Sequence, residues 1–266
     1  MPFTIYCRPE DDWLFGTIAR PLAQATGSPI VDRPQGCCYV LSNPAGHDGF
    51  TSFIPLPAID LAADKRAIEQ AFHAAGIARP RTWILGTEAE VEHLVAQHPQ
   101  RKFIVKYPTS CGSSGHYTFR GRFTPKKHWP LPFIVQEFLL QETPGVHRVY
   151  FSGGACIGSN VRRFPAGVRH DLIAHAKGAR YCYDDPVDAA GIEQARRALL
   201  AVGLLDSFGV VDLLRVDGAW YALEVGTDGI HNIVDRDVGN DAFLALLTQR
   251  IADAFIQRCA AVPAAG

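Results

Sequence analysis

The sequence has almost no net charge, no long apolar run and no paired-cysteine motif. Lys and Arg number 26 against 27 Asp and Glu, so we expect neither nucleic acid nor a membrane as a partner. The longest nearly apolar stretch, Ala198 to Leu205, is far shorter than the roughly 20 residues that span a bilayer. The first residues, MPFTIYCRPEDDW, contain no apolar signal core. The seven cysteines lack CxxC spacing, which predicts free thiols and a cytoplasmic location rather than a disulfide framework or a zinc site.

Several motifs of common enzyme classes are also missing. The sequence has no GxxxxGK[ST] and no GxGxxG between a strand and a helix, which argues against two common nucleotide-binding folds. The run Gly112–Gly115 resembles a nucleophile elbow, but the G-x-S-x-G spacing fails. No HExxH pair is present among the ten histidines. A hydrophobic content of 47% with 20% charged residues nevertheless indicates a folded chain with a sizeable core.

Helix–strand alternation followed by a strand-rich stretch predicts an α+β fold. The leading segment, residues 1–58, is a short α/β unit that ends near Pro55 and Pro57. A helix is expected at 60–76, with Asp60 as its cap and Gly76 at its end. The other expected helices are 13–25, 88–97, 187–203 and 240–258. The expected strands are 3–7, 37–41, 50–54, 81–85, 103–107, 133–138, 147–151, 155–164 and two that flank the hairpin turn Asp217-Gly218.

Lys106 ends the apolar strand FIVKY, and the small residues of Thr109–Gly115 follow it directly. The exposed N–H groups of such a loop can close over phosphate oxygens, with the ammonium of the lysine nearby. A Gly/Ser turn after a strand is also common without any ligand, so this half of the pattern leaves both interpretations open.

A pair of carboxylates lies about a hundred residues later. Asp212 falls within the apolar strand SFGVVDLLRV, and Glu224 ends the next strand, AWYALEV. The turn at Asp217-Gly218 would bring both carboxylates to one face of a sheet, where hard oxygen ligands hold Mg²⁺ through nucleotide phosphates. A structural salt bridge would equally explain a carboxylate in so apolar a strand.

With these residues in order, the chain resembles the ATP-grasp superfamily of carboxylate–amine ligases. It is most similar to the group with D-alanine–D-alanine ligase, glutathione synthetase and the ribosomal-protein glutamate ligases. The resemblance covers about residues 60–260, through Asp64-Lys65, AGIARPRTWIL, FIVKYPTSCGSSG, FIVQEFL, HRVYF, NVRRF, GVVDLL and YALEVGTDGIHN. It implies an ATP-grasp domain over 59–262, whose two α+β subdomains grip ATP. These are a small lid of about 80–138 and a C-terminal subdomain of about 139–262, preceded by the shortened segment 1–58.

The resemblance also implies ATP and Mg²⁺ as cofactors and assigns a role to each matching residue. Lys65 and Lys106 would bind phosphates, under a loop containing Ser113, Ser114 and Gly115. Adenine would be read by the backbone of Glu137, Phe138 and Leu139, and the ribose by Glu142. The catalytic cations would be Arg148 and Arg163 together with Lys106, and the metal ligands Asp212 and Glu224.

The sequence departs from the family pattern in two places. The family usually has Asn two residues after the metal-binding Glu, where this chain has Gly226. That ligand is therefore missing or supplied by Asp228 or Asn232. The leading segment is shorter than the usual substrate-binding domain, which implies a small acceptor pocket or one completed by a homodimer or a partner protein.

The activity implied is a two-step ligation of an amino acid, small metabolite or peptide. A carboxylate attacks the γ-phosphate to give ADP and an acyl phosphate, and an amine then displaces phosphate. The alternatives are a catalytically impaired ATP-binding or scaffold protein, suggested by Gly226, and an ATP-dependent phosphotransferase on the same fold. We expect Asp212→Asn or Glu224→Gln to abolish turnover and leave the fold intact.

The roles of four residues stay open in this interpretation. Arg162 and Arg163 are adjacent on a strand and so point to opposite faces, which leaves one of them as a surface charge. Arg169 and Asp171 face either phosphate or substrate, or solvent.

Overall fold

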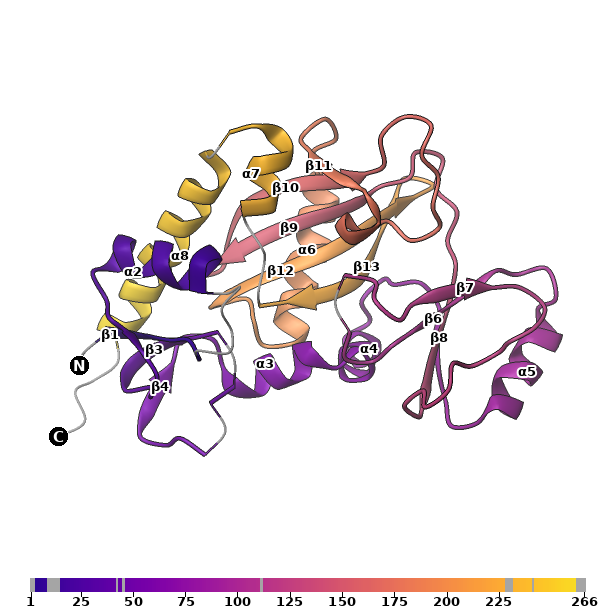
Figure 1. Cartoon of the computed structure of the whole chain (residues 1–266), viewed down its shortest axis with the longest axis horizontal. Helices are drawn as coiled ribbons and strands as arrows, with labels where there is room; N and C mark the ends of the chain where they lie inside the picture. Colours follow the sequence, from indigo (N-terminus) through magenta and orange to yellow (C-terminus); the bar gives the residue numbers. More distant parts are fainter. Residues whose placement is uncertain are drawn as a thin grey trace.

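The computed structural model describes residues 3–8, 15–41, 43–44, 46–110, 112–227, 232–240 and 242–261. Within them the chain forms three sheets, which follow one another along the sequence (Figure 1). Helices cover these sheets, which confirms the α+β prediction. Among the described residues, no helix is both long enough and apolar enough to cross a bilayer.

The first sheet is built from the leading segment. Its strands run in the order β2-β1-β3-β4 and all pair in parallel. Its elements are β1 Phe3–Tyr6, η1 Phe15–Ala19, α2 Arg20–Thr26, β2 Ile30–Val31, β3 Gly36–Val40 and β4 Phe50–Ser52. The expected helix at 13–25 appears as η1 and α2, while Trp13 lies outside the described residues.

The second sheet stands apart from the rest of the molecule, at the right of Figure 1. It comprises β5 Thr82–Leu85, β6 Phe103–Lys106, β7 Tyr117–Phe119 and β8 Phe133–Glu137, in the antiparallel order β5-β8-β6-β7. Helix α5 (Glu88–Gln97) begins with a capping box between Thr87 and Glu90 and packs on one face of this sheet, which has its own apolar core. The opposite face carries Ile104, Lys106 and Gln136.

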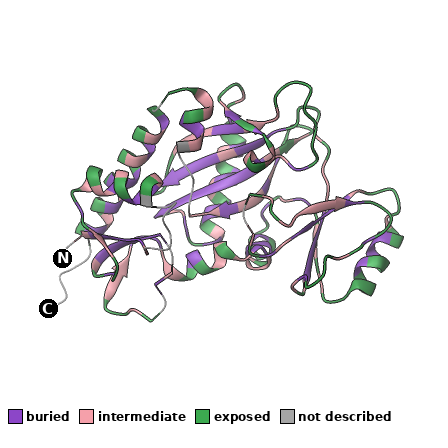
Figure 2. Cartoon of the chain, viewed as in Figure 1, coloured by how far each residue is buried: buried purple, intermediate pink, exposed green. Residues whose placement is uncertain are grey.

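The third sheet is the largest and supplies the floor of the site described below. Its order is β11-β10-β9-β12-β13, all antiparallel, and strands β9 and β12 in its middle are the most buried (Figure 2). The bounds are β9 Val146–Ser152, β10 Ala155–Arg163, η2 His175–Lys177, β11 Arg180–Cys182, α6 Ala189–Ala201, β12 Phe208–Val216, β13 Ala219–Gly226, α7 Asn232–Val238 and α8 Ala242–Ala260.

The turn between β12 and β13 is the predicted one. Val216 pairs with Ala219, and the two residues between them, Asp217 and Gly218, both have positive φ (50° and 79°). Such a turn matches the right-handed twist of the strands and fixes their register. The hairpin therefore sets the pairing from Val216 and Ala219 to Leu213 and Ala222, and a bulge beyond that point places Asp212 opposite Glu224.

The prediction of one helix over 60–76 is wrong. The structure has two helices there, α3 (Leu56–Ala63) and α4 (Lys65–Ala74). Asp64 separates them in an extended conformation (φ −120°, ψ 114°), and its carboxylate accepts a hydrogen bond from the backbone N–H of Arg66 at 2.8 Å. Asp64, and not Asp60, is thus the N-cap.

The prediction that all cysteines are free is also wrong. Cys37 on β3 and Cys259 near the end of α8 form a disulfide across 222 residues of sequence. They meet because α8 packs on the leading segment, where Phe255 contacts Tyr39 and Phe53. One apolar core therefore joins the leading segment to the third sheet.

We expect the disulfide to be detectable by thiol labelling. Unfolded, unreduced protein should take up two fewer maleimide groups per chain than reduced protein, and mass mapping should assign the protected pair to Cys37 and Cys259. Cys259→Ser should abolish the difference and lower the free energy of unfolding by about 2–5 kcal/mol. Equal labelling of both samples would contradict the disulfide.

Candidate active site

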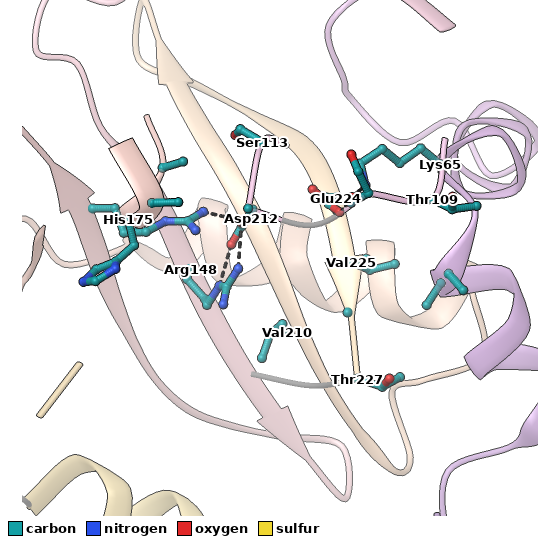
Figure 3. A pocket seen from close by; sticks show the side chains of 18 of the residues that line it. Lys65, Thr109, Ser113, Arg148, His175, Val210, Asp212, Glu224, Val225 and Thr227 are labelled. Carbon is teal, nitrogen blue, oxygen red and sulfur yellow. Dashed lines mark hydrogen bonds and ion pairs between the residues drawn. The ribbon is translucent and has the colours of Figure 1, made fainter. Parts of the chain in front are cut away.

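A cavity of about 530 Å³ lies over the third sheet (Figure 3). Its floor is formed by β9, β10, β12 and β13, and its walls by the end of the first sheet, helix α3, the loop after β6 and residues 173–176. Segments that follow strands of the first and second sheets therefore join the third sheet around one cavity. Of the predicted site residues, Lys65, Ser113, Arg148, Asp212 and Glu224 line it.

Asp212 is the centre of the floor. It lies opposite Glu224 of β13 on one side and Arg148 of β9 on the other, so the three side chains share a face of the sheet. The Nε and NH2 of Arg148 donate to the carboxylate at 2.7 and 3.0 Å, and Arg162 of β10 also donates to it. Burial would raise the pKa of Asp212, but the two guanidinium groups outweigh burial and lower it to about 2.

The structure selects between the two adjacent arginines of β10. Arg162 lines the cavity and binds Asp212, and its guanidinium also lies 5.6 Å from the ring of Tyr181. Arg163, which we expected to be catalytic, points to the opposite face of the sheet, where it pairs with Asp184 and Asp185. The cavity cation on this strand is therefore Arg162.

Glu224 and Lys65 form the second charged pair of the site. The Nζ of Lys65 lies 2.8 Å from Oε1 of Glu224 and also donates to the carbonyl oxygen of Ser110 at 2.5 Å. Its backbone N–H donates to Pro108 O at 3.0 Å. The first residue of α4 thus connects the loop after β6 to the carboxylate of β13.

The loop after β6 carries the small residues predicted to cover phosphates. Ser113 lines the cavity with a positive φ of 60°, whereas Ser114 is exposed and outside the cavity lining. A Cβ at Gly115 would lie 3.0 Å from the Cβ of Tyr107, and its φ is +75°, so glycine is required there. Lys106 itself is 7% exposed and does not line the cavity.

His116 anchors this loop and was missed in the sequence. Its Nδ1 accepts the backbone N–H of Tyr107 at 3.3 Å. Burial, and then the ammonium groups of Lys106 and Lys65, lower the pKa of His116 to about 3. The ring is therefore neutral at neutral pH and can accept this bond. A single histidine after a glycine carries no sequence pattern that would have singled it out.

The residues predicted to bind the nucleoside do not line the cavity. The N–H groups of Glu137 and Phe138 donate to Arg81 O and Lys102 O, both at 2.9 Å. The carboxylate of Glu137 accepts the backbone N–H of Arg81 at 2.7 Å, and Glu142 is exposed. Contacts of this segment with adenine and ribose remain predictions.

The predicted metal ligands are only partly within the described structure. Asp228 and the side chain of Asn232 lie outside it, and the described residues contain no group of three or more His, Cys, Asp or Glu that could hold a metal ion. Asp212 and Glu224 are nevertheless cross-strand neighbours with hard oxygen donors. These carboxylates are already paired with Lys65, Arg148 and Arg162, so the donor set fits a cation that is bound together with phosphate oxygens, which bring further negative charge.

Sequence reasoning also missed the wall after β10. His175 and Tyr181 line the cavity, and their rings stack with centroids 6.2 Å apart. Asp171 does not line the cavity but binds Lys102 at 2.5 Å and Thr118 at 2.6 Å on the second sheet. Arg169 is exposed and outside the cavity lining.

Solved structures share this architecture over nearly the whole chain. D-cycloserine synthetase DcsG has a TM-score of 0.65 at 17% identity, covering 97% of this chain and 100% of its own. D-alanine–D-alanine ligase from Bacillus anthracis complexed with ATP has a TM-score of 0.62 at 13% identity, covering 98% and 99%. The ATP-grasp ligase PsnB complexed with a phosphomimetic variant of minimal precursor, Mg and ADP has a TM-score of 0.66 at 14% identity, covering 97% and 98%.

No family model matches the sequence, and no curated protein matches it. The likeness is therefore one of structure, and it agrees with the resemblance found in the ordered motifs. The chain has the ATP-grasp fold.

Proposed function

We propose that the protein is an ATP-dependent carboxylate–amine ligase that forms an amide bond through an acyl phosphate and releases ADP and phosphate. The observation that carries this proposal is the row of charges over the third sheet. Arg162 and Arg148 bind Asp212, Glu224 lies beside Asp212, and Lys65 binds Glu224. This is a set of cations and hard oxygen donors at the base of a cavity, on a fold shared with ATP-dependent ligases.

The side chains of this row have complementary tasks in phosphoryl transfer, which needs positioning and neutralisation of charge rather than a protein nucleophile. Lys65 and the loop containing Ser113 would hold phosphate oxygens. Arg148 and Arg162 would orient the attacking carboxylate and neutralise charge as the acyl phosphate forms. Mg²⁺, held by Asp212 and Glu224, would neutralise further negative charge on the phosphates.

The acceptor amine comes from a small molecule or a peptide. Solved PsnB structures contain precursor peptides, and D-cycloserine synthetase is named for a small product. Proteins with this fold are therefore associated by name with both a peptide and a small molecule. Whether a second copy or a partner protein completes the acceptor site remains a prediction.

A hydroxylamine trap should reveal the reaction. With Mg-ATP, pooled amino acids, small carboxylates and short peptides, and hydroxylamine as a universal amine, we expect ADP together with a hydroxamate whose mass identifies the carboxylate. Glu224→Gln should reduce ADP formation about a hundredfold, because one such charge contributes on the order of 3 kcal/mol in a dry site.

Glu92→Gln, an equally conservative change on the exposed face of α5, should leave the rate unchanged. AMP in place of ADP would overturn the mechanism. Nucleotide binding without either product would favour an impaired ATP-binding protein. A phosphorylated acceptor formed without any amine would favour a phosphotransferase.

Asp212 also has a structural role, so Asp212→Asn should destabilise the fold, contrary to the expectation from sequence. The variant leaves two buried guanidinium groups without their anionic partner, and we expect a loss of about 3–5 kcal/mol in the free energy of unfolding. Urea denaturation at pH 7 measures it, with the exposed Asp253→Asn as the matched control. Equal stability of the two variants would refute this role.

The stabilising effect of Asp212 should depend on pH in a defined direction. Its pKa is lowered from 3.8 to about 2 in the folded state. The stabilisation is therefore complete above about pH 4 and is lost as the pH falls towards 2. The stability difference between wild type and Asp212→Asn should shrink over this interval, and a difference that stayed constant would contradict the assignment.

A further inference from the structure

A buried carboxylate joins the second sheet to the rest of the molecule and has no task in the proposed chemistry. This residue is Glu69 of α4, which is 6% exposed. Its Oε1 accepts a hydrogen bond from Nε2 of Gln136 on β8 at 3.1 Å, and its Oε2 accepts one from Nε of Arg79 at 2.9 Å. One carboxylate thus holds helix α4 against β8 and against the segment that leads into β5.

That segment is fixed in turn to the third sheet. The carbonyl oxygen of Ala78 accepts the backbone N–H of Ala222 on β13 at 2.9 Å and Nε2 of Gln194 on α6 at 2.7 Å. Because Arg79 follows Ala78 directly, the contacts of Glu69 lie where the chain passes from the third sheet to the second. The position of the second sheet over the rest of the molecule therefore depends on this junction.

Glu69 is also connected to both lysines that are predicted to bind phosphate. On α4 it follows Lys65 by four residues, which is about one helical turn and places both residues on one side of the helix. On the second sheet its partner Gln136 shares a face with Lys106, because Lys106 pairs with Ile134, two residues before Gln136. Glu69 therefore binds the strand beside Lys106, while its own helix begins with Lys65.

The ammonium of Lys106 is stabilised by charges at a distance. Lys106 is 7% exposed, and within the part of the chain that the structure describes it takes part in no ion pair. Burial lowers the pKa of Lys106, and the carboxylate of Glu69 is the largest of the charges that oppose this effect. Glu69 therefore acts on Lys106 electrostatically as well as through the position of the sheet.

We propose that Glu69 is a positioning residue for the nucleotide, which holds β8 and α4 together so that Lys106 and Lys65 bind the phosphates of one ATP molecule. The inference rests on the proposed function in that the phosphates of ATP are the ligand of these two lysines. A displacement of a binding group by about 1 Å can cost about a hundredfold. The hydrogen bonds of Glu69 restrict such a displacement between the second sheet and α4.

An exchange of side chains between Glu69 and Gln136 tests this role, with the binding of Mg²⁺ and a non-hydrolysable ATP analogue measured by calorimetry. Glu69→Gln removes the charge and should weaken binding about 10- to 100-fold. Gln136→Glu brings two carboxylates together and should weaken binding by a similar factor. The double variant, Glu69→Gln with Gln136→Glu, again has one carboxylate and one amide at this contact, and we expect it to bind within about threefold of the wild type.

A second variant keeps the test informative if Glu69→Gln does not fold, because that change leaves the buried Arg79 with a neutral partner. Gln136→Leu leaves the ion pair of Glu69 with Arg79 in place and should weaken binding about tenfold. Urea denaturation measures the stability of each variant, and affinities are compared where the protein is folded. The control Glu92→Gln, on the exposed face of α5, should bind like the wild type.

A purely structural role predicts lower stability with unchanged affinity. Unchanged affinity in folded Glu69→Gln or Gln136→Leu would therefore overturn the proposal. So would a double variant that binds no better than the two single variants.

The same measurements separate this proposal from the proposed ligase activity. If ADP and a hydroxamate form while Glu69→Gln binds the nucleotide like the wild type, the ligase proposal stands and the role of Glu69 fails. If affinity falls in Glu69→Gln and recovers in the double variant but no ADP or hydroxamate ever forms, the role of Glu69 stands and the ligase proposal fails. The absence of any nucleotide binding by the wild type would overturn both.

Discussion

The ion pairs between Asp212 and the arginines Arg148 and Arg162 constrain the whole centre of the molecule. A buried carboxylate is costly unless cations and hydrogen bonds compensate it. Here the compensation comes from two other strands, so β9, β10 and β12 must keep one register. A slip of one residue would turn the charged side chains to the opposite face. The same interaction that keeps this part of the sheet in register thus positions the candidate chemistry.

Lys65 extends that constraint to the loop after β6. It begins α4, binds Glu224 on the third sheet and binds the carbonyl of Ser110 in the loop after β6. A ligand that replaced Glu224 or Ser110 as its partner would therefore act on the loop and the sheet together. Asp171 makes a second connection between the sheets through Lys102 and Thr118. The contacts of Lys65 and those of Asp171 therefore both connect the part of the chain that forms the second sheet to the part that forms the third.

Local signals in the sequence predicted the features that depend on local geometry. The turn residues Asp217 and Gly218 are enough to pair β12 with β13, whereas a bulge between Leu213 and Asp212 is also needed to place Asp212 opposite Glu224. The choice between Arg162 and Arg163 depends instead on a bulge in β10 between Cys156 and Gly158. Because one extra residue reverses the two faces of a strand, alternation alone cannot decide which arginine reaches the cavity.

Other features arise only from tertiary packing. Cys37 and Cys259 are 222 residues apart and meet because α8 lies against the first sheet. The break between α3 and α4 follows from a cap at Asp64, which the helical spacing across 60–76 concealed. The cavity wall around His175 has no periodic pattern in the sequence. Each of these features depends on neighbours in the fold that no short motif specifies.

The three carboxylates of the cavity show how charge balance can separate tasks within one hollow. Asp212 is buried between two guanidinium groups, so its charge is largely committed to the sheet. Glu224 is 39% exposed in its side chain and shares one flexible ammonium with a carbonyl oxygen, so its partner can be exchanged at lower cost. Within the part of the chain that the structure describes, Asp60 accepts hydrogen bonds from the amide of Asn43 and belongs to no ion pair. The carboxylate whose charge is most fully paired is therefore the one that holds the strands together, and the less tightly paired Glu224 is the one whose partner a ligand can replace.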